Sequence, residues 1–293
     1  MSQTKTSITF WGTRGSVATP GPQTEKYGGN TSCVSVKHNN SYFVFDAGTG
    51  IRAFGDFFLT ELAEEKCQPE INLLLSHTHW DHIQGLPFFS PAYKENINFN
   101  IFSRLRNKGQ LEKLLTGQME QNYFPIPMSK MSADIQIKEF SDTPSCVDNI
   151  DVSNTQQEHP GGSHAYKLNC NGKTVVYSTD NELNLIFDND ANPLNEKAQA
   201  YLKFIQDADL LIADGQYTDE EYLEKKGWGH STISILLKVA SKAKVKRTAV
   251  FHHDPYHSDT DLDEISQTYF EDYQSIDPDF EFFWAKEGLV VQL

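Results

Sequence analysis

The sequence predicts a layered α/β fold in which helices cover sheets of buried strands. Short apolar runs alternate with helical patterns along the whole chain of 293 residues. One run, Ile71–Leu75, is apolar throughout, as expected of a strand buried on both faces. Hydrophobic residues make up 38% of the chain, enough for a substantial core. Because neither a repeat nor a linker-like stretch interrupts this pattern, we expect one domain spanning residues 1–293.

The expected strands are short apolar runs bounded by Gly, Asn, Asp or Pro. In chain order they are Ser7–Trp11, Cys33–Lys37, Tyr42–Asp46, Ile71–Leu75, Phe99–Phe102, Ile135–Phe140, Lys167–Leu168, Thr174–Ser178, Leu210–Ala213, Thr248–Phe251 and Glu281–Trp284. The helical patterns between them are Phe54–Ala63, Gly109–Gln118, Lys197–Asp207, Ser231–Ala243 and Asp261–Ser275. The clearest helix is the one that Ser231 and Thr232 open, because both residues are good N-caps.

Charge and composition exclude several classes of protein. Lys and Arg number 25 against 40 Asp and Glu, and the resulting net charge of −15 disfavours an extended nucleic-acid partner. No run approaches the ~20 apolar residues of a membrane span, and the N-terminus lacks a signal-peptide pattern. The four cysteines lack C-x-x-C spacing, which is typical of reduced thiols in the cytoplasm. We therefore expect a cytoplasmic protein without a membrane partner.

The segment after strand Ile71–Leu75 has the composition of a metal-binding loop, because it reads SHTHWDH. Four side chains that bind metals lie within six residues, and each needs a partner to offset its desolvation. These residues are His77, His79, Asp81 and His82. The alternative is that these side chains only belong to a polar surface loop, which does not explain why four of them lie so close together. His77 and His79 project to one side of an extended chain, and a turn at Trp80 would bring the other two to a second ion.

Further candidate ligands follow expected strands downstream. His159 precedes a Pro-Gly-Gly turn, Asp180 lies just past strand Thr174–Ser178, and His252 lies just past Thr248–Phe251. The ends of strands are where an α/β sheet presents functional side chains. The neighbouring His253 is the alternative to His252, and because adjacent strand residues face opposite ways only one of them can point to the site.

These motifs resemble the metallo-β-lactamase-fold hydrolases, and specifically their phosphodiesterase branch of ribonuclease Z-type enzymes, cyclic-nucleotide phosphodiesterases and cyclic-phosphate esterases. The similarity covers nearly the whole chain and includes FDAGTG around Asp46, HTHWDH, WGTRGS near the N-terminus and YGGNTSC. It implies a four-layer αββα sandwich. It also implies that two divalent metal ions are bound, one by His77, His79 and His159, the other by Asp81, His82 and His252, with Asp180 bridging them. Asp46 is expected to be structural.

A second motif, WGHST around His230, is similar to the His-Ser-Thr motif of the ribonuclease Z-like enzymes. There the histidine contacts the scissile phosphate and protonates the leaving oxygen. Asp214 matches the acidic residue that orients this histidine in the family. A carboxylate partner raises the pKa of an imidazole and suits it to general acid catalysis. The alternative is that His230 only precedes a helix in a surface loop.

Together these features predict a dinuclear phosphodiesterase that hydrolyses a small cyclic nucleotide or cyclic phosphate through a metal-bridged hydroxide. Asp81 and Asp180 would anchor the metals and accept the nucleophile's proton, while His230, held by Asp214, acts as the acid. Five imidazoles and two carboxylates favour zinc, with manganese as the alternative. The other functions to consider are tRNA 3′-processing, lactone or thioester hydrolysis, and a non-catalytic metal-binding role. The resemblance also implies a homodimer.

Overall fold

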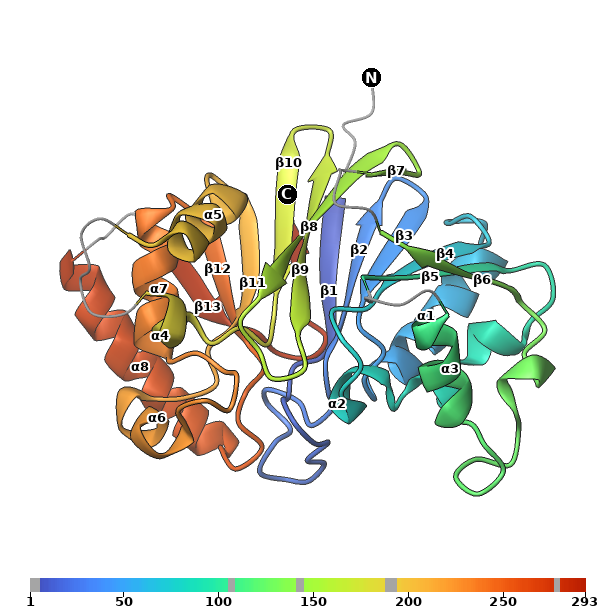
Figure 1. Ribbon diagram of the computed structural model, residues 1–293, viewed down its shortest axis with the longest axis horizontal. Helices are drawn as coiled ribbons and strands as arrows, with labels where there is room; N and C mark the ends of the chain where they lie inside the picture. The colour runs from blue at the N-terminus through green and yellow to red at the C-terminus, as the bar shows by residue number, and fades with distance from the viewer. Residues whose placement is uncertain (1–5, 105–108, 141–144, 188–193, 277–279) are drawn as a thin grey trace.

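The computed structural model describes residues 6–104, 109–140, 145–187, 194–276 and 280–293. It contains two seven-stranded mixed sheets that face each other, with helices on both outer faces (Figure 1). The first sheet has the order β14 (Val290–Gln292), β1 (Thr6–Gly12), β2 (Cys33–His38), β3 (Ser41–Phe45), β4 (Glu70–Leu74), β5 (Asn98–Ser103) and β6 (Asp134–Glu139). The second has the order β13 (Glu281–Trp284), β12 (Arg247–Phe251), β11 (Leu210–Asp214), β10 (Lys173–Ser178), β9 (Ser163–Cys170), β8 (Ile150–Gln157) and β7 (Ser145–Val147).

The helices form the two outer layers and complete the expected αββα sandwich (Figure 1). Helices α1 (Ile51–Ala63) and α3 (Gln110–Gly117) lie on the side of the first sheet. On the side of the second sheet lie α4 (Leu183–Ile186), α5 (Glu196–Ile205), α6 (Asp219–Lys225), α7 (Ile233–Lys242) and α8 (Asp259–Ile276). The one-turn helix α2 (Trp80–Ile83) lies apart from both groups, and three short 3₁₀ turns cover Leu86–Phe88, Ser90–Tyr93 and Met128–Lys130.

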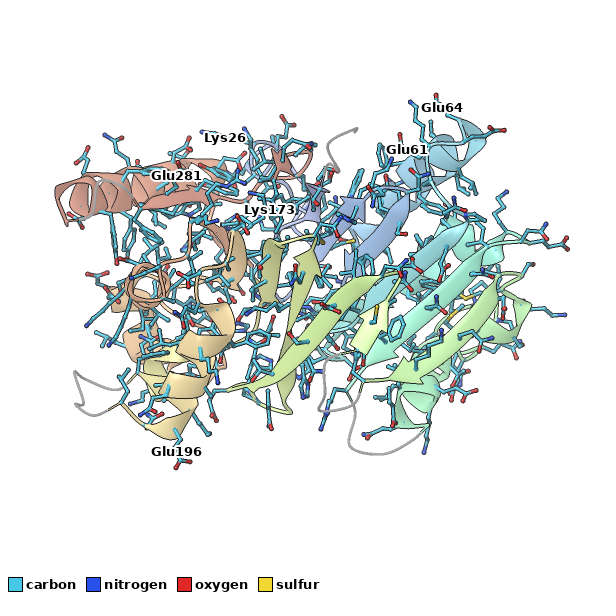
Figure 2. All side chains as sticks on the ribbon, turned by 90° about the horizontal axis from the view of Figure 1, so that it is seen from above. Lys26, Glu61, Glu64, Lys173, Glu196 and Glu281 are labelled. Carbon is cyan, nitrogen blue, oxygen red and sulfur yellow. The ribbon has the colours of Figure 1, made fainter. Side chains whose placement is uncertain are left out.

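The alternation of side chains along each strand builds these layers. On β3, Phe43 and Phe45 point into the core between the sheets, whereas Tyr42 and Val44 pack in the core that contains α1. Phe45 stacks on Tyr177 of the opposite sheet, with ring centroids 4.7 Å apart. Many charged side chains lie at the periphery, and Figure 2 shows Glu64 at the upper right edge of the molecule and Glu196 at its lower left edge.

All eleven expected strands and all five expected helices occur, with their ends shifted by a few residues. Helix α7 begins at Ile233, two residues later than expected, because Thr232 is its N-cap and accepts from the amide of Ile235. Strands β7 and β14 and helices α2, α4 and α6 were not among the expected elements, and β8 was expected only as an undefined strand before His159. Among the described helices, none combines the length and apolar character needed to cross a bilayer.

The topology brings several strand ends to the same edge of the sandwich. Strands β3 to β6 are mutually parallel, as are β10 to β13, so within each group the carboxyl ends lie side by side. The segments that follow β4, β8, β10, β11 and β12 carry the candidate site residues. Helix α2, which contains Asp81 and His82, marks this edge at the bottom of Figure 1.

Candidate metal centre

The structure brings all seven predicted metal ligands together. One group consists of His77, His79 and His159, whose ligand atoms lie within 4.8 Å of one another. A second group of the same size consists of Asp81, His82 and His252. A further group contains His77, His82 and Asp180 and so connects the first two groups. We call the first group the first half of the cluster and the second group the second half. Residues 175 positions apart in the sequence therefore form one cluster, as expected of a dinuclear site.

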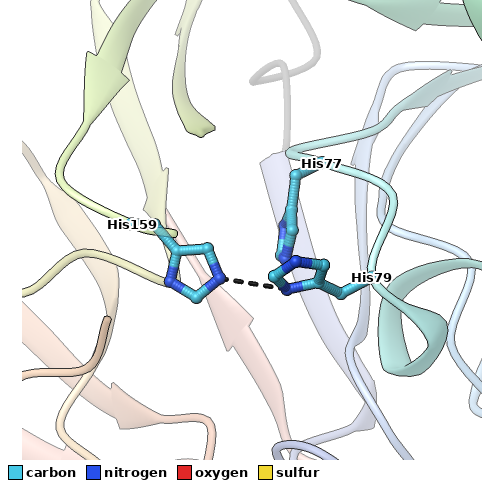
Figure 3. A group of neighbouring side chains, drawn as sticks. All are labelled: His77, His79 and His159. Carbon is cyan, nitrogen blue, oxygen red and sulfur yellow. Dashed lines mark hydrogen bonds between the residues drawn. The ribbon is translucent and has the colours of Figure 1, made fainter. Parts of the chain in front are cut away.

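His79 and His159 face each other in the first half of the cluster (Figure 3). The distance between His159 Nε2 and His79 Nδ1 is 3.1 Å, and His159 Nδ1 lies 2.9 Å from the carbonyl oxygen of Gly229. Because that carbonyl can only accept, His159 carries its proton on Nδ1 and directs the Nε2 lone pair toward His79. A histidine that binds a metal ion typically donates one ring N–H to a carbonyl oxygen and directs the lone pair of its other nitrogen toward the ion, as His159 directs its Nε2.

His77 completes the first half and presents an unpartnered nitrogen. Its Nδ1 lies 3.1 Å from Ser76 Oγ, and that hydroxyl donates to Asp46 Oδ2 at 2.8 Å. His77 Nδ1 is therefore the donor, and Nε2 carries a lone pair. Nε2 is buried and has no hydrogen-bond partner among the residues that the structure describes. Burial lowers the pKa of both His77 and His159, which keeps these imidazoles neutral, as metal ligands must be.

The second half pairs His82 with His252 in the same way. His82 Nδ1 donates to Asp46 at 2.7 Å, and His252 Nδ1 donates to Gln216 Oε1 at 3.0 Å. Their Nε2 atoms face each other at 3.3 Å. Burial lowers the pKa of His82, but the surrounding charges of Asp81, Asp180 and Asp46 outweigh it and raise that pKa well above its usual value. This half of the cluster therefore favours positive charge.

Asp180 lies between the two halves of the cluster, and each of its carboxylate oxygens faces one half. Oδ1 is 3.7 Å from His77 Nε2 and 3.6 Å from His159 Nε2, whereas Oδ2 is 3.2 Å from His82 Nε2 and 3.4 Å from His252 Nε2. This geometry fits a bridging carboxylate. The buried nitrogen without a partner and the facing imidazole nitrogens together fit a pair of divalent ions.

His252, rather than His253, faces this cluster. His253 Nε2 donates to the carbonyl oxygen of Ala285 at 2.7 Å, and its ring packs edge-on against Tyr27. His252 adopts a positive φ of 62°, and this left-handed conformation directs its ring to Asp81 and His82. The left-handed turn at His252, rather than the alternation of an extended strand, therefore separates the two candidates.

His230 lies next to the cluster and is held by Asp214. His230 Nδ1 is 2.7 Å from Asp214 Oδ2, at the end of β11. The His230 ring stacks on His252 at a centroid distance of 5.0 Å and lies edge-on to His159 at 5.3 Å. Burial lowers the pKa of His230, but the charge and hydrogen bond of Asp214 outweigh it and raise the pKa to about 9. His230 can therefore hold a proton beside the cluster.

The structure also shows residues that orient the ligands and were not predicted from sequence. Ser76 and Gln216 fix the tautomers of His77 and His252, and the amide of Ser16 donates to Asp81 Oδ2 at 2.8 Å. Only Ser76, adjacent to the metal-binding loop, could have been suspected. Arg14 is fully buried and donates to the carbonyl oxygens of Gly28, Asp254 and His257, so its role is structural.

Comparisons with known proteins identify the family and the fold of this chain. A family described as a beta-lactamase superfamily domain matches residues 41–253. Ribonuclease Z from Picrophilus torridus is 24% identical over 296 aligned residues, covering 87% of this chain and 88% of the relative. Among solved structures, unliganded yeast PDE1 has a TM-score of 0.70 at 15% identity and covers 99% of this chain and 100% of its own. The short form of human tRNase Z has a TM-score of 0.60 at 17% identity and covers 97% and 98%.

At these identities the solved structures establish the fold alone. The family match, in contrast, spans the strands and loops that carry the HTHWDH motif, His159, Asp180, Asp214, His230 and His252. The fold family implies divalent metal ions, for which the His and Asp groups of this chain are suited. The chain therefore belongs to the beta-lactamase superfamily, with the metallo-β-lactamase fold of metal-dependent hydrolases.

Proposed function

We propose that this protein is a dinuclear phosphodiesterase that hydrolyses a small cyclic nucleotide or cyclic phosphate. The observation that carries the proposal is the buried His230–Asp214 pair, with a 2.7 Å contact, beside two groups of potential metal ligands. Hydrolysis of a phosphodiester requires stabilisation of the phosphoryl oxygens and protonation of a poor leaving group. The ligand cluster and His230 provide these two functions from adjacent positions.

The ligands divide between two ions in this proposal. His77, His79 and His159 would hold the first ion and Asp81, His82 and His252 the second, and the distances to both oxygens of Asp180 would suit it to hold both. When bound, the two ions supply Lewis-acid stabilisation of the phosphoryl group and a water of lowered pKa as nucleophile. Five imidazoles and two carboxylates favour zinc, and manganese is the alternative.

Side chains of the protein accept and donate the protons that hydrolysis transfers. Asp81 and Asp180 accept the proton of the attacking water, because their oxygens line the ligand cluster. Asp214 accepts from Nδ1 of His230, which leaves Nε2 to donate a proton to the leaving oxygen. The His230 ring contacts both His159 and His252, which supports a role as the acid for a substrate bound at either half of the cluster.

Charge supports a small substrate. The net charge of −15 disfavours a long polyanion, which would need many Lys and Arg contacts, whereas a small ester is bound by the metal centre itself. We also propose that the protein is cytoplasmic and homodimeric, as the sequence resemblance implies.

A second candidate function is 3′-processing of tRNA. The observation that favours it is that curated relatives named Ribonuclease Z, from Picrophilus torridus and Haloferax volcanii, align over 87% and 83% of this chain. Both functions would use the same centre and the same acid. They differ in the size of the polyanion that must be bound, so substrate assays separate them.

The deciding experiment is a panel of 3′,5′- and 2′,3′-cyclic nucleotides, cyclic dinucleotides, bis(p-nitrophenyl) phosphate and pre-tRNA, with zinc or manganese and after chelation. We expect turnover of a cyclic substrate that is lost on chelation. His230→Ala should lower kcat on the cyclic substrate by about 10²–10⁴-fold. His38→Ala is the control and should retain activity, because it removes the last residue of β2, whose ring contacts Thr6 of β1 rather than the ligand cluster. Trimming of pre-tRNA without turnover of any small diester would overturn the proposal.

A further inference from the structure

Glu182 is a buried carboxylate that belongs to none of the predicted ligand sets. Only 1% of the residue is exposed, and its oxygens accept three hydrogen bonds. Oε1 accepts from Tyr222 Oη and from the amide of Gly227, both at 2.7 Å, and Oε2 accepts from the amide of Gly229 at 2.8 Å. We propose that Glu182 is a positioning residue that fixes His159 and His230 together, an inference that rests on the roles proposed for these two histidines.

The contacts of Glu182 join three loops, each of which carries a site residue. Its own loop follows β10 and contains Asp180, and its amide donates to the carbonyl oxygen of Glu158, next to His159, at 2.8 Å. Its side chain holds the Gly227–Gly229 segment, next to His230. One residue therefore ties the loops of Asp180, His159 and His230 to each other.

Neighbouring contacts reinforce the same junction. Ser231 Oγ donates to the carbonyl oxygen of Asn181 and accepts from the amide of Leu183 at 3.0 Å. Asn181 Oδ1 accepts from the amide of Glu158 at 2.9 Å. Ser231 thus connects the His230 loop to the Asp180 loop, rather than capping α7 as the sequence suggested. The loops form one hydrogen-bonded unit with Glu182 at its centre.

Gly229 connects Glu182 to His159 and His230. Its amide donates to Glu182, its carbonyl oxygen accepts from His159 Nδ1 at 2.9 Å, and the next residue is His230. Its φ is +93°, and a Cβ there would lie 2.2 Å from His159 Nδ1, so only glycine permits this approach. Displacement of this one residue would shift both the orientation of His159 and the start of the His230 segment.

The chemistry of the three donors explains why the residue is a glutamate. Two amides and a hydroxyl converge on two oxygens, and only a side chain that accepts at both ends satisfies them all. A glutamine would turn its NH₂ group toward at least one N–H and leave that donor unsatisfied in a buried site. Replacement by glutamine therefore changes the contact with the Gly227–Gly229 segment at nearly constant volume.

The test compares Glu182→Gln with Glu220→Gln, an exposed glutamate of α6, in the metal-loaded protein. Elemental analysis should find about two ions per chain in the wild type and in Glu220→Gln, and about one in Glu182→Gln, because the orientation of His159 is lost. Turnover should fall more for an alkyl phosphodiester than for bis(p-nitrophenyl) phosphate, since the p-nitrophenolate group needs little protonation. Two tightly held ions with a wild-type ratio of the two rates would overturn the proposal.

A simple loss of stability predicts a different result, in which both ions and both activities decline together. Amide hydrogen exchange of the metal-free protein provides a readout independent of activity, and exchange across Gly227–His230 should accelerate in Glu182→Gln. If Glu182→Gln does not fold, Ser231→Ala must show this acceleration, and unchanged exchange would reject the proposed unit. Loss of one ion in Glu182→Gln without any phosphodiesterase activity would support the positioning role while rejecting the proposed function.

Discussion

His82 Nδ1 donates to Asp46 Oδ2 across 2.7 Å, although the two residues follow different strands. The same carboxylate accepts from the amide and hydroxyl of Ser76 at 2.7 and 2.8 Å and from Tyr177 Oη at 2.8 Å. Asp46 thus orients His82 directly and His77 through Ser76, one imidazole from each half of the centre. Tyr177 comes from the second sheet, so the carboxylate also links the two sheets beneath the site.

Asp46→Asn should destabilise the protein and weaken metal binding. The amide group would face donors that now bond to a carboxylate, leaving at least one buried donor unsatisfied. We expect the free energy of unfolding to fall by about 2–4 kcal/mol and metal affinity to fall by about 10–100-fold. Urea unfolding of the metal-free protein and competitive chelator titration measure the two effects. Asp56→Asn on the exposed face of α1 is the control, and equal metal affinity in both variants would contradict the role of Asp46.

Gly15→Ala should perturb the second half of the centre selectively. A Cβ at Gly15 would lie 2.4 Å from His252 Nδ1, so the ring would have to move away from Gln216. We expect the protein to retain about one ion per chain and to lose most of its activity. Gly117→Ala is the matched control, because a Cβ there meets no atom within 4 Å. Elemental analysis of both variants checks this, and two retained ions in Gly15→Ala would refute it.

The grouping of the candidate ligands was predictable because their signals are local. His77, His79, Asp81 and His82 lie within six residues, and Asp180 and His252 each follow a strand that the apolar pattern marks clearly. The partners that orient them were not predictable. Gln216 lies 36 residues from His252 in the sequence, and Glu182 lies 47 residues from Gly229. The packing of the loops brings Gln216 to His252 and Glu182 to Gly229, and no pattern in the local sequence specifies these two contacts.

The same distinction applies to the fold. Strands with continuous apolar runs were predicted, whereas β8 is polar at most positions along Ile150–Gln157 and forms through its pairing with β9. Helix α6 had a usable local signal that was overlooked. Thr218 caps the helix, and Glu221 returns a hydrogen bond to the Thr218 amide, the capping box that T-x-x-E encodes.

Asp214→Asn should reduce catalysis in a way that depends on the leaving group. The asparagine lacks the negative charge that raises the pKa of His230. It also makes a weaker hydrogen bond with His230 Nδ1 than the carboxylate does. We expect turnover of an alkyl or ribose ester to fall by about 10²-fold or more, with a smaller loss for a p-nitrophenyl ester. Steady-state kinetics with both substrates tests this at constant metal content. An equal loss for both leaving groups would assign Asp214 a role other than supporting the acid.

Glu221→Gln should lower stability at neutral pH but not in strong acid. Glu221 accepts from His257 Nε2 at 2.7 Å and from the Thr218 amide at 2.8 Å. Burial raises the pKa of Glu221, but these hydrogen bonds, together with the charges of His257 and Lys225, outweigh it and lower the pKa to about 2. Because the folded state depresses this pKa, the carboxylate stabilises the protein fully above the usual glutamate pKa of 4.5, and the contribution is lost as the pH falls toward 2.

We expect Glu221→Gln to reduce the free energy of unfolding by only about 1 kcal/mol at pH 6, because solvent screens the charge of a side chain that is 31% exposed. The difference from the wild type should shrink steadily below pH 4.5. Urea titrations of the metal-free proteins between pH 6 and 3 measure this without interference from metal release. Glu220→Gln on the same helix should show no such trend. A difference that stays constant over this range would show that Glu221 acts through packing and capping rather than through its charge.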